Sequence, residues 1–474
     1  MKRVRIALAF LVTLLGVSTA AAQRLVWLGT LGGNKSQGHG VSPDGRFVVG
    51  VARDASGADR AVRWDLRAWY TTYNTELIAI EELGTLGGTF SEAYGVSADG
   101  SVVVGSAATA DNLIHAFRWE ATTGEMKDLG TLGGTASVAT AISADGRFVV
   151  GWAEDGEGRR RPFRWDATTG VMQDLGTLGG PGGWANDVAA DGRSVVGMAT
   201  NTGDKRHAFR WDASTETMQD LGTLDGTQSE ATGISENGDL VVGFVDQTIF
   251  GFPPTTIRRA FLWDIYTEQM VRLDTLESYP RDYWYEAHDV SANGFFVVGV
   301  VRDQIGTFSR AVRWQAWRRG IEDLNDAYAS LLTDGSILYI ASAISPDGRY
   351  IVGSGYNAAT GRVEAYLLDT GIATATDASS QPEAFRILPP WPNPFREAVH
   401  VPFHLPAPTP VRLEVYDLLG RSVRVLVEGP LGAGTHTFVW DGRDGRGRRL
   451  PPGLYVLRLE AGGRTATRII ACAR

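Results

Sequence analysis

The chain has 474 residues, with 58 glycines, 14 tryptophans and a formal net charge of −9. This length is too great for one ordinary compact domain unless the chain is built from repeats, and the composition favours a turn-rich all-β protein. The acidic balance gives no reason to expect nucleic-acid binding. The single cysteine, Cys472, excludes intrachain disulfides and thiolate metal sites in the main body.

Residues 1–22 are typical of a secretory signal peptide. A basic start (Lys2, Arg3 and Arg5) is followed by the apolar stretch 6–17 and by the small residues 20–22. The apolar stretch is too short to span a bilayer comfortably. We therefore expect export through the inner membrane and no transmembrane anchor.

The segment Leu-Gly-Thr-Leu-Gly-Gly recurs from residue 28 onward, with a spacing of 46 residues among the central copies. The copies begin at Leu28, Leu83, Leu129 and Leu175, with altered copies at Leu221 and Leu273. Each unit also holds an Asp-Gly or Asn-Gly turn, at residues 44, 99, 145, 191, 237, 293 and 347. These features predict seven repeats over residues 23–370.

Each unit is predicted to form four short strands, as the third unit illustrates with 138–143, 147–151, 162–166 and 171–175. Asp-Gly between apolar runs favours a tight hairpin in which both turn residues take positive φ. Four strands in 46 residues are typical of a propeller blade, and a β-helix ranks second. We therefore predict an all-β fold, a seven-bladed β-propeller followed by a small immunoglobulin-like β-sandwich.

Comparison among the units predicts a strand register and a closure of the ring. A three-residue loop at Thr168–Gly170 places Arg164 opposite Asp174, as a cross-strand ion pair. The last unit lacks a fourth strand, and the segment 24–28 reads as an unpartnered one. We expect this N-terminal strand to complete the last blade, with Trp27 opposite Leu367, and so to remove an exposed sheet edge.

The repeated Leu-Gly-Thr-Leu-Gly-Gly and Ala-Phe-Arg-Trp segments resemble the HAF repeat of extracellular bacterial proteins, over residues 25–369. This resemblance implies export and a propeller-like array. It implies no particular chemistry.

The C-terminal part differs in composition. Residues 371–383 are small and polar, as in a linker. Residues 384–474 hold thirteen arginines against seven acidic residues, and short alternating strands that predict an immunoglobulin-like sandwich. The segments Pro392–Phe395, Tyr416–Arg421 and Pro452–Tyr455 resemble the C-terminal sorting domain of type IX secretion cargo and the related flagellar-hook-assembly Ig module. The resemblance implies recognition by the type IX translocon as partner, and an extracellular or cell-surface location. A permanent sandwich domain without a sorting role is the alternative.

Motifs for chemistry are scarce. The sequence holds no HExxH, P-loop or GxSxG motif, and its seven histidines do not form a metal-binding pattern. One Asp per turn is explained by hairpin geometry better than by calcium binding. We therefore expect no catalytic residue, metal site or cofactor.

The fifth and sixth units depart from the repeat in two loops that should lie side by side. One is the linking segment 277–288, and the other is the loop between strands two and three of the fifth unit. Aromatic rings beside arginines and carboxylates suit a carbohydrate or peptide ligand, and a repacked blade junction is the alternative. The candidate ligand-binding residues are Phe250, Phe252, Arg258, Tyr279, Arg281, Asp282, Tyr283, Trp284, Tyr285 and His288.

Two functions are consistent with these features. The first is an exported, non-enzymatic propeller with a binding or structural role. The second is a glycan-active hydrolase or lyase on the same scaffold, which needs two converging carboxylates with separated pKa values. Glu277, Asp282 and Glu286 are the candidates for that role.

Overall fold

A computed structural model describes residues 23–249, 255–265, 268–292, 294–315 and 320–371 of the repeat region. In the C-terminal module it describes residues 386–387, 390–391, 393, 395–405, 408–417, 421–432, 434–462 and 464–473. The expected signal peptide, nearly all of the expected linker, Phe250 and Phe252 lie outside these residues. Among the described helices, none combines the length and the apolar character needed to cross a membrane.

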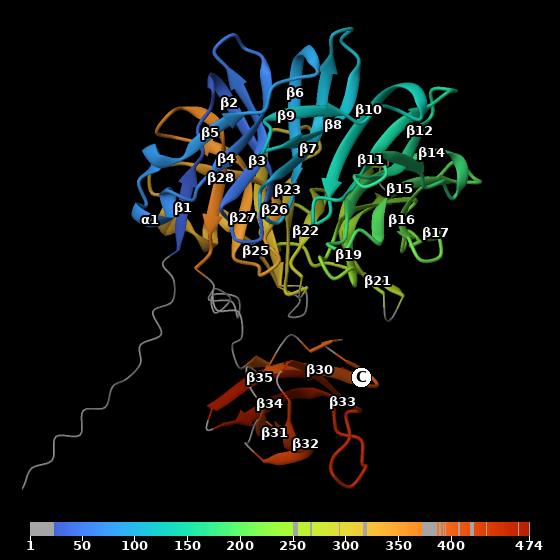
Figure 1. Ribbon diagram of the computed structural model, residues 1–474, viewed down its shortest axis with the longest axis vertical. Coiled ribbons are helices and arrows are strands. Elements are labelled where there is room, and N and C mark those ends of the chain that lie inside the picture. Colours follow the sequence, from blue (N-terminus) through green and yellow to red (C-terminus); the bar gives the residue numbers. More distant parts are fainter. Residues whose placement is uncertain are drawn as a thin grey trace, which may run out of the picture.

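The repeat region is all-β, and five of its units form separate antiparallel four-stranded sheets, as predicted (Figure 1). A parallel contact between Lys35 and Val363 joins the strands of the first and last units into one sheet. The third unit shows the pattern, with β10 (Gly133–Ile142), β11 (Phe148–Asp155), β12 (Arg160–Asp166) and β13 (Val171–Asp174) paired in chain order. The first strand begins earlier than predicted, because Gly133 and Gly134 belong to it. A Cβ on Gly134 would lie 2.6 Å from the carbonyl oxygen of Asp155, so only glycine fits there.

The other units repeat this order. Their strands are β2 (Gly32–Val41), β3 (Phe47–Asp54), β4 (Asp59–Asp65) and β5 (Ala79–Glu82); β6 (Gly87–Val96), β7 (Val102–Thr109), β8 (Ile114–Glu120) and β9 (Glu125–Asp128); β14 (Gly179–Val188), β15 (Ser194–Asn201), β16 (Arg206–Asp212) and β17 (Thr217–Asp220); β18 (Gln228–Ile234), β19 (Leu240–Ile249), β20 (Thr255–Asp264) and β21 (Gln269–Arg272); β22 (Trp284–Val290), β23 (Phe296–Arg302), β24 (Ser309–Gln315) and β25 (Gly320–Asp323); and β26 (Ile337–Ile344), β27 (Tyr350–Asn357) and β28 (Arg362–Asp369).

Short helices interrupt the pattern in two units. In the first unit, α1 (Trp69–Thr72) and η1 (Thr75–Leu77) stand between β4 and β5. After the sixth unit, α2 (Leu324–Ala327) and η2 (Ala329–Leu331) precede β26.

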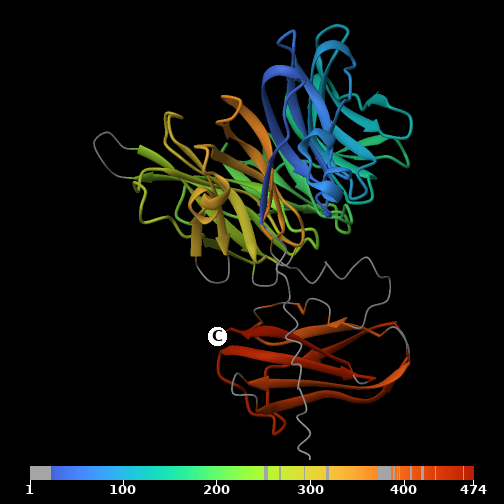
Figure 2. The same ribbon diagram turned by 90° about the vertical axis from the view of Figure 1, so that its left-hand side faces the viewer.

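The N-terminal strand β1 (Arg24–Trp27) pairs antiparallel with β28 and completes the last sheet, which confirms the predicted closure (Figure 1). Val26 and Leu28 are buried in the core that the last and first sheets share. The two sheets lie side by side in Figure 2. The predicted register was wrong by one residue, because Trp27 faces Tyr366 and Val26 faces Leu367.

The predicted Arg164–Asp174 pair was also wrong, because the register of strands three and four differs by one residue from the prediction. Asp166 pairs with Val171, so the loop has four residues instead of three, and Arg164 faces Gln173. The partner of Asp174 is Arg161, whose Nε lies 2.9 Å from the Asp174 carboxylate. Arg164 instead donates to the carbonyl of Gly192 in the Asp-Gly turn of the next unit, at 2.8 Å. It therefore joins two sheets.

The Asp-Gly turns also differ from the prediction. Only the glycine takes positive φ, +73° at Gly146, and Asp145 does not. The Asp145 carboxylate accepts hydrogen bonds from the Ser143 hydroxyl and the Arg147 amide, and this closes a four-residue loop. Aspartate is therefore used here for its side-chain acceptor.

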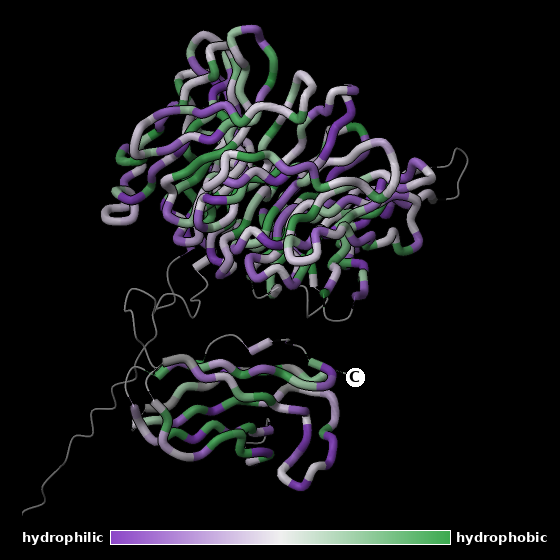
Figure 3. Tube along the Cα trace, turned by 45° about the vertical axis from the view of Figure 1, so that its right-hand side comes forward, coloured by the Kyte–Doolittle hydropathy of each residue, from purple (hydrophilic) through white to green (hydrophobic). Residues whose placement is uncertain are grey.

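Adjacent sheets pack through strand three of one unit and strand one of the next. Ser137 on β10 accepts the amide of Ala116 on β8 at 2.9 Å and donates to the carbonyl of Gly130 at 2.6 Å. A tryptophan on strand three fills the space between sheets and is at most 3% exposed, at residues 64, 119, 165, 211, 263 and 314. Figure 3 shows the hydrophobic positions along the strands and the hydrophilic ones in many of the loops.

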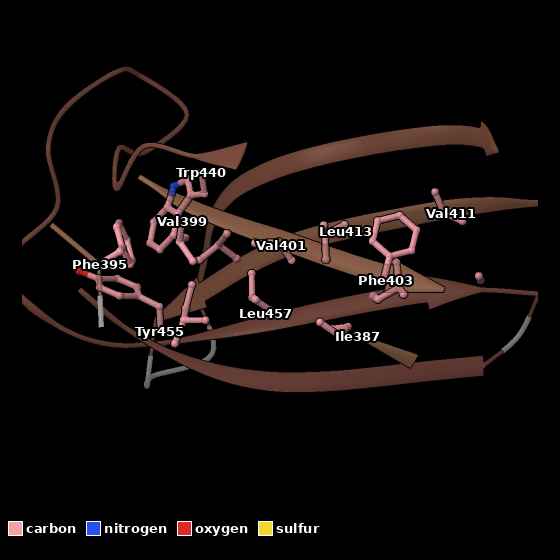
Figure 4. Packing of buried hydrophobic residues seen from close by; sticks show 14 of the residues in the cluster. Ile387, Phe395, Val399, Val401, Phe403, Val411, Leu413, Trp440, Tyr455 and Leu457 are labelled. Carbon is pink, nitrogen blue, oxygen red and sulfur yellow. The ribbon is translucent and has the colours of Figure 1, made fainter. Parts of the chain in front are cut away.

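The C-terminal module is a two-sheet Ig-like sandwich. One sheet holds β29 (Arg386–Ile387), β30 (Val399–Leu405) and β33 (Gly434–Trp440). The other holds β31 (Thr409–Asp417), β32 (Ser422–Leu431), β34 (Gly453–Ala461) and β35 (Arg464–Cys472). Buried side chains of both sheets meet between them, among them Val401, Phe403, Leu413, Trp440 and Leu457 (Figure 4).

Candidate functional site

The repeat region has two faces. In the first four units the linking segment lies beside the end of strand two, as Leu132 does beside Asp155, so linking segments and strand two-to-three loops share one face. We call it the loop face. The Asp-Gly turns lie on the opposite side, the turn face. The described site residues, His288 excepted, stand at the loop face, between the fifth and sixth sheets.

The linking segment 277–283 is held from both sides. Arg259 of β20, which is 7% exposed, donates to the carbonyl of Tyr283 at 2.7 Å and to that of Arg281. The Tyr279 hydroxyl donates to the carboxylate of Asp323 at the end of β25. Burial, reinforced by this carboxylate, raises the pKa of Tyr279. The segment is therefore fixed to the fifth sheet and to the sixth.

The three tyrosines of the predicted site contribute to packing. Tyr279 and Tyr283 are partly buried and stack with ring centroids 6.3 Å apart, and both rings contact Phe308. Tyr285 is 1% exposed within the core between the two sheets. Its ring is therefore closed to a ligand in this conformation.

Trp284 behaves differently, because two arginines lie close to its ring. The guanidinium carbon of Arg258 is 4.7 Å from the ring centroid and that of Arg302 is 5.2 Å away. Arg258 also stacks on Phe244 at 4.2 Å. The indole Nε1 donates to the carbonyl of Thr256 at 3.1 Å, which fixes the ring orientation. We call Phe244, Arg258, Trp284 and Arg302 the platform.

Glu286 holds the two arginines of the platform. Its Oε1 accepts from Arg258 at 2.7 Å and from Arg302 at 2.8 Å, and its side chain is only 8% exposed. Burial alone would raise the pKa of this carboxyl. The hydrogen bond and charge of His288 and the two guanidinium charges outweigh burial and lower the pKa of Glu286 to about 2. Glu286 is therefore ionised at neutral pH and serves as a fixed counterion.

The remaining predicted residues lie around this centre. Arg281, Asp282 and Glu277 are exposed, and the carbonyl of Asp282 accepts from Gln304 at 3.3 Å. His288 Nδ1 donates to the carbonyl of Ala341 in the next sheet at 3.0 Å, and its Nε2 lies 4.0 Å from Glu286. The structure thus brings Arg258, Trp284 and Glu286 together and leaves Glu277, Arg281 and Asp282 at the surface.

A second feature, which sequence reasoning missed, lies at the turn face. The last residue of every first strand lines a cavity of about 140 Å³ there: Val41, Val96, Ile142, Val188, Ile234, Val290 and Ile344. Three carboxylates, those of Asp187, Glu236 and Asp289, also line it. Asp187 and Asp289 stand where other units have Gly or Ala, as at Gly95, Ala141 and Gly233.

These two aspartates join neighbouring sheets. Asp187 accepts the amide of Ile234 at 2.9 Å and Asp289 accepts that of Ile344 at 2.9 Å. Burial raises the pKa of both carboxyls, and the charge of Asp289 adds to the increase at Asp187. The signal in the sequence was the change from a small residue to Asp in Ala-Asn-Asp and Ala-His-Asp. No group of three or more possible metal ligands is placed to hold an ion among the residues that the structure describes.

Comparison with known proteins identifies the C-terminal module. Residues 396–464 match the model of the FlgD Ig-like domain. No curated protein matches the chain.

Solved structures resemble the chain at low identity. TolB from Acinetobacter baumannii is 15% identical with a TM-score of 0.37, and the match covers 53% of this chain and 54% of that one. An oligogalacturonate lyase from Vibrio parahaemolyticus is 11% identical with a TM-score of 0.46, over 73% of this chain and 93% of that one. PorZ, a surface component of the type-IX secretion system of Porphyromonas gingivalis, is 13% identical with a TM-score of 0.39, over 94% and 59%. The chain thus spans about half the length of this TolB.

Proposed function

We propose that this chain is an exported, non-enzymatic propeller that binds a carbohydrate or peptide ligand on its loop face, at the platform between the fifth and sixth units. The observation that carries the proposal is the Trp284 ring, half-buried and close to both Arg258 and Arg302. An indole face suits the apolar face of a sugar or an aromatic side chain, and a guanidinium suits a carboxylate.

The platform is rigid before any ligand arrives. Glu286 orients both guanidinium groups, and the Trp284 indole is fixed through the carbonyl of Thr256. Arg302 remains 37% exposed at its side chain, so it can reach a ligand while still paired. A site prepared in this way loses little conformational entropy on binding.

The glycan-active alternative is less well supported by the chemistry of the same site. A glycosidase needs one carboxylic acid that is protonated near neutral pH. Glu286 has its pKa lowered to about 2 and is neutralised by two guanidiniums, so it cannot donate a proton at neutral pH. Glu277 and Asp282 are exposed, so neither lies in an enclosed pocket that could hold a sugar ring between two carboxyl groups.

Binding can be tested by pull-down of residues 23–474 on insoluble polysaccharides and on peptidoglycan. Trp284→Ala should weaken binding at least about fivefold, because a face-on aromatic contact contributes roughly 1 kcal/mol or more. Trp184→Ala is the matched control, since Trp184 is also half-buried on a first strand but lies in the regular fourth unit. Equal binding by all three proteins would place the site elsewhere, and failure of the wild type to bind would favour a structural role.

The architecture we propose is a closed seven-bladed propeller of the HAF-repeat kind. Its support is the cavity at the turn face, to which the first strand of each of seven units contributes its last residue. The antiparallel pairing of β1 with β28 supplies the fourth strand of the seventh unit. Closure of this kind leaves no free sheet edge between the last and first units.

We further propose that residues 1–22 direct export and that the C-terminal Ig-like module directs type IX secretion, giving an extracellular or cell-surface protein. Support comes from the signal-like N-terminal sequence and from the module's Pro-Asn-Pro-Phe and Pro-Gly-Leu-Tyr segments. A chain lacking residues 384–474 should then remain in the periplasm while the full chain reaches the surface. Surface delivery of the shortened chain would contradict this role.

A further inference from the structure

The loop after β33 is the most basic exposed segment of the C-terminal module. Residues 441–450, which we call the arginine hairpin, carry four exposed arginines, Arg443, Arg446, Arg448 and Arg449, and two aspartates. Arg396, also exposed, accepts a hydrogen bond from Arg449 at its carbonyl and so adds a fifth guanidinium beside the hairpin. The surface therefore keeps an excess of positive charge.

The arginine hairpin is an ordered structure. The Asp444 amide donates to the carbonyl of Arg448 at 2.9 Å, and the Leu450 amide donates to that of Gly442 at 2.9 Å. The Asp444 carboxylate accepts the amides of Arg446 and Arg448 and pairs with the Arg448 guanidinium at 2.9 Å. This aspartate stabilises the turn and neutralises one arginine. Arg446 makes no ion pair with any residue that the structure describes.

Exposed apolar side chains lie on the sheet from which the hairpin arises. Trp391 is 36% exposed and stacks on His400, with ring centroids 5.1 Å apart and planes 11° apart. Val439, directly opposite His400 in the β30–β33 pair, is 55% exposed. The chain turns from Val439 into the hairpin within two residues. The surface thus combines guanidinium groups with an exposed indole and an exposed aliphatic side chain.

We propose that this surface binds a lipid bilayer with phosphate-bearing anionic headgroups, as a peripheral contact. Guanidinium forks match phosphate geometry, and each arginine near an anionic membrane surface adds to the attraction. Tryptophan prefers the boundary between headgroups and acyl chains. Val439, which is 55% exposed on the same sheet, offers a nucleic-acid base no ring to stack on but can contact acyl chains, which favours lipid over a single-stranded nucleic acid. The contact is separate from the platform of the propeller.

The test is co-sedimentation of the protein, residues 23–474, with phosphatidylcholine vesicles that contain or lack phosphatidylglycerol. The wild type should bind only the anionic vesicles, and added salt should release it because the arginines are exposed. Arg446→Ser should lower the partition coefficient about fivefold, and adding Arg449→Ser about fivefold more. Trp391→Ala should lower it further.

Arg458→Ser is the matched control, because it removes the same charge from the other sheet, where Arg458 pairs with Glu460. Retention of wild-type binding by this variant supports the proposal, whereas an equal loss in Arg446→Ser and Arg458→Ser would overturn it in favour of net charge alone. Absence of wild-type binding to anionic vesicles would also overturn it. Capture by heparin without vesicle binding would assign the surface to a soluble polyanion instead. Melting temperatures equal to the wild type's confirm that the variants are folded.

Discussion

The third unit and the fifth have the same two positions on strands three and four and use them differently. In the third unit, Arg161 on strand three pairs with Asp174 at the end of strand four, 2.9 Å apart. In the fifth unit, Arg259 occupies the first position, but the second is Arg272. Without an acidic partner, Arg259 turns to the carbonyls of Arg281 and Tyr283 in the linking segment. Because Arg272 replaces the acid of the regular units, Arg259 contacts the neighbouring linking segment instead of a partner in its own sheet.

The sixth unit shows the complementary change. Asp323 is retained at the acidic position, yet its carboxylate accepts from Tyr279 of the linking segment and from Asn325. In the second and fourth units, the equivalent Asp128 and Asp220 pair with His115 and His207 of their own sheets. In these regular units the acid at the end of strand four therefore finds its partner within its own sheet. The fifth and sixth units use theirs to fix a longer loop, and this positions Trp284.

Tyr285→Ala, in the junction between the fifth and sixth units, should cause the largest loss of stability. Tyr285 is 1% exposed where the regular units have a serine such as Ser137 or Ser91, so its ring fills the junction core. We expect a loss of about 3–5 kcal/mol in the free energy of unfolding, measured by denaturant titration. Tyr285→Phe should cost under about 1 kcal/mol, because the hydroxyl is 3.4 Å from its acceptor, the carbonyl of Leu276. Equal losses in the two variants would mean that the hydroxyl, not the ring, matters.

Glu286→Gln should have the next largest effect, a loss of roughly 3 kcal/mol in the free energy of unfolding, because Arg302 loses the carboxylate with which it pairs and Arg258 is left with Asp246. The same variant should weaken ligand binding, since Glu286 would no longer hold Arg302 against Trp284 and Arg258 would be held by Asp246. Differential scanning calorimetry together with the pull-down measures both effects. A variant as stable as the wild type would show that the ion pairs do not hold the junction together.

The contribution of Glu286 should depend on pH in a defined direction. Its folded-state pKa is lowered from its usual value of 4.5 to about 2, so the folded state binds protons less readily than the unfolded state. The stabilisation is then complete above pH 4.5 and declines as the pH falls toward 2. The stability difference between wild type and Glu286→Gln should shrink over this window. A difference that stays constant from pH 6 to pH 2 would contradict the assignment of a charged Glu286.

Asp174→Asn should have the smallest effect. Its side chain is 39% exposed and pairs with Arg161 at the surface. The loss in the free energy of unfolding should therefore be under about 1 kcal/mol and should decrease with added salt. Urea titration at low and high salt measures it. A loss comparable to that of Glu286→Gln would remove the contrast between regular units and junction.

Much of this architecture was visible in the sequence. The four-strand unit, the closing role of residues 24–28 and the Ig-like module were predicted correctly, because turn residues and alternating apolar residues determine them locally. The register of strands three and four was predicted wrongly, because four loop residues lie between Asp166 and Val171 where three were assumed. A shift of one residue reverses the side chain's direction, so Arg161 was overlooked in favour of Arg164.

The site was predicted in position but not in detail. The aromatic linking segment was located from its departure from the repeat. Which ring is buried depends on how the segment folds back onto both sheets, and this is set by Arg259 and Asp323, far away in the sequence. Asp187 and Asp289 were missed because each is a single change in an otherwise regular strand.

We propose that a ligand binds at the irregular junction between the fifth and sixth units and not at the regular units. Hydrogen–deuterium exchange of the protein, with and without the bound polysaccharide or peptidoglycan fraction, locates the contact. We expect added protection in peptides covering residues 255–260, 281–288 and 300–304, and none in the equivalent peptides of the third and fourth units. Protection confined to the regular units or to the turn face, or no protection anywhere, would contradict it.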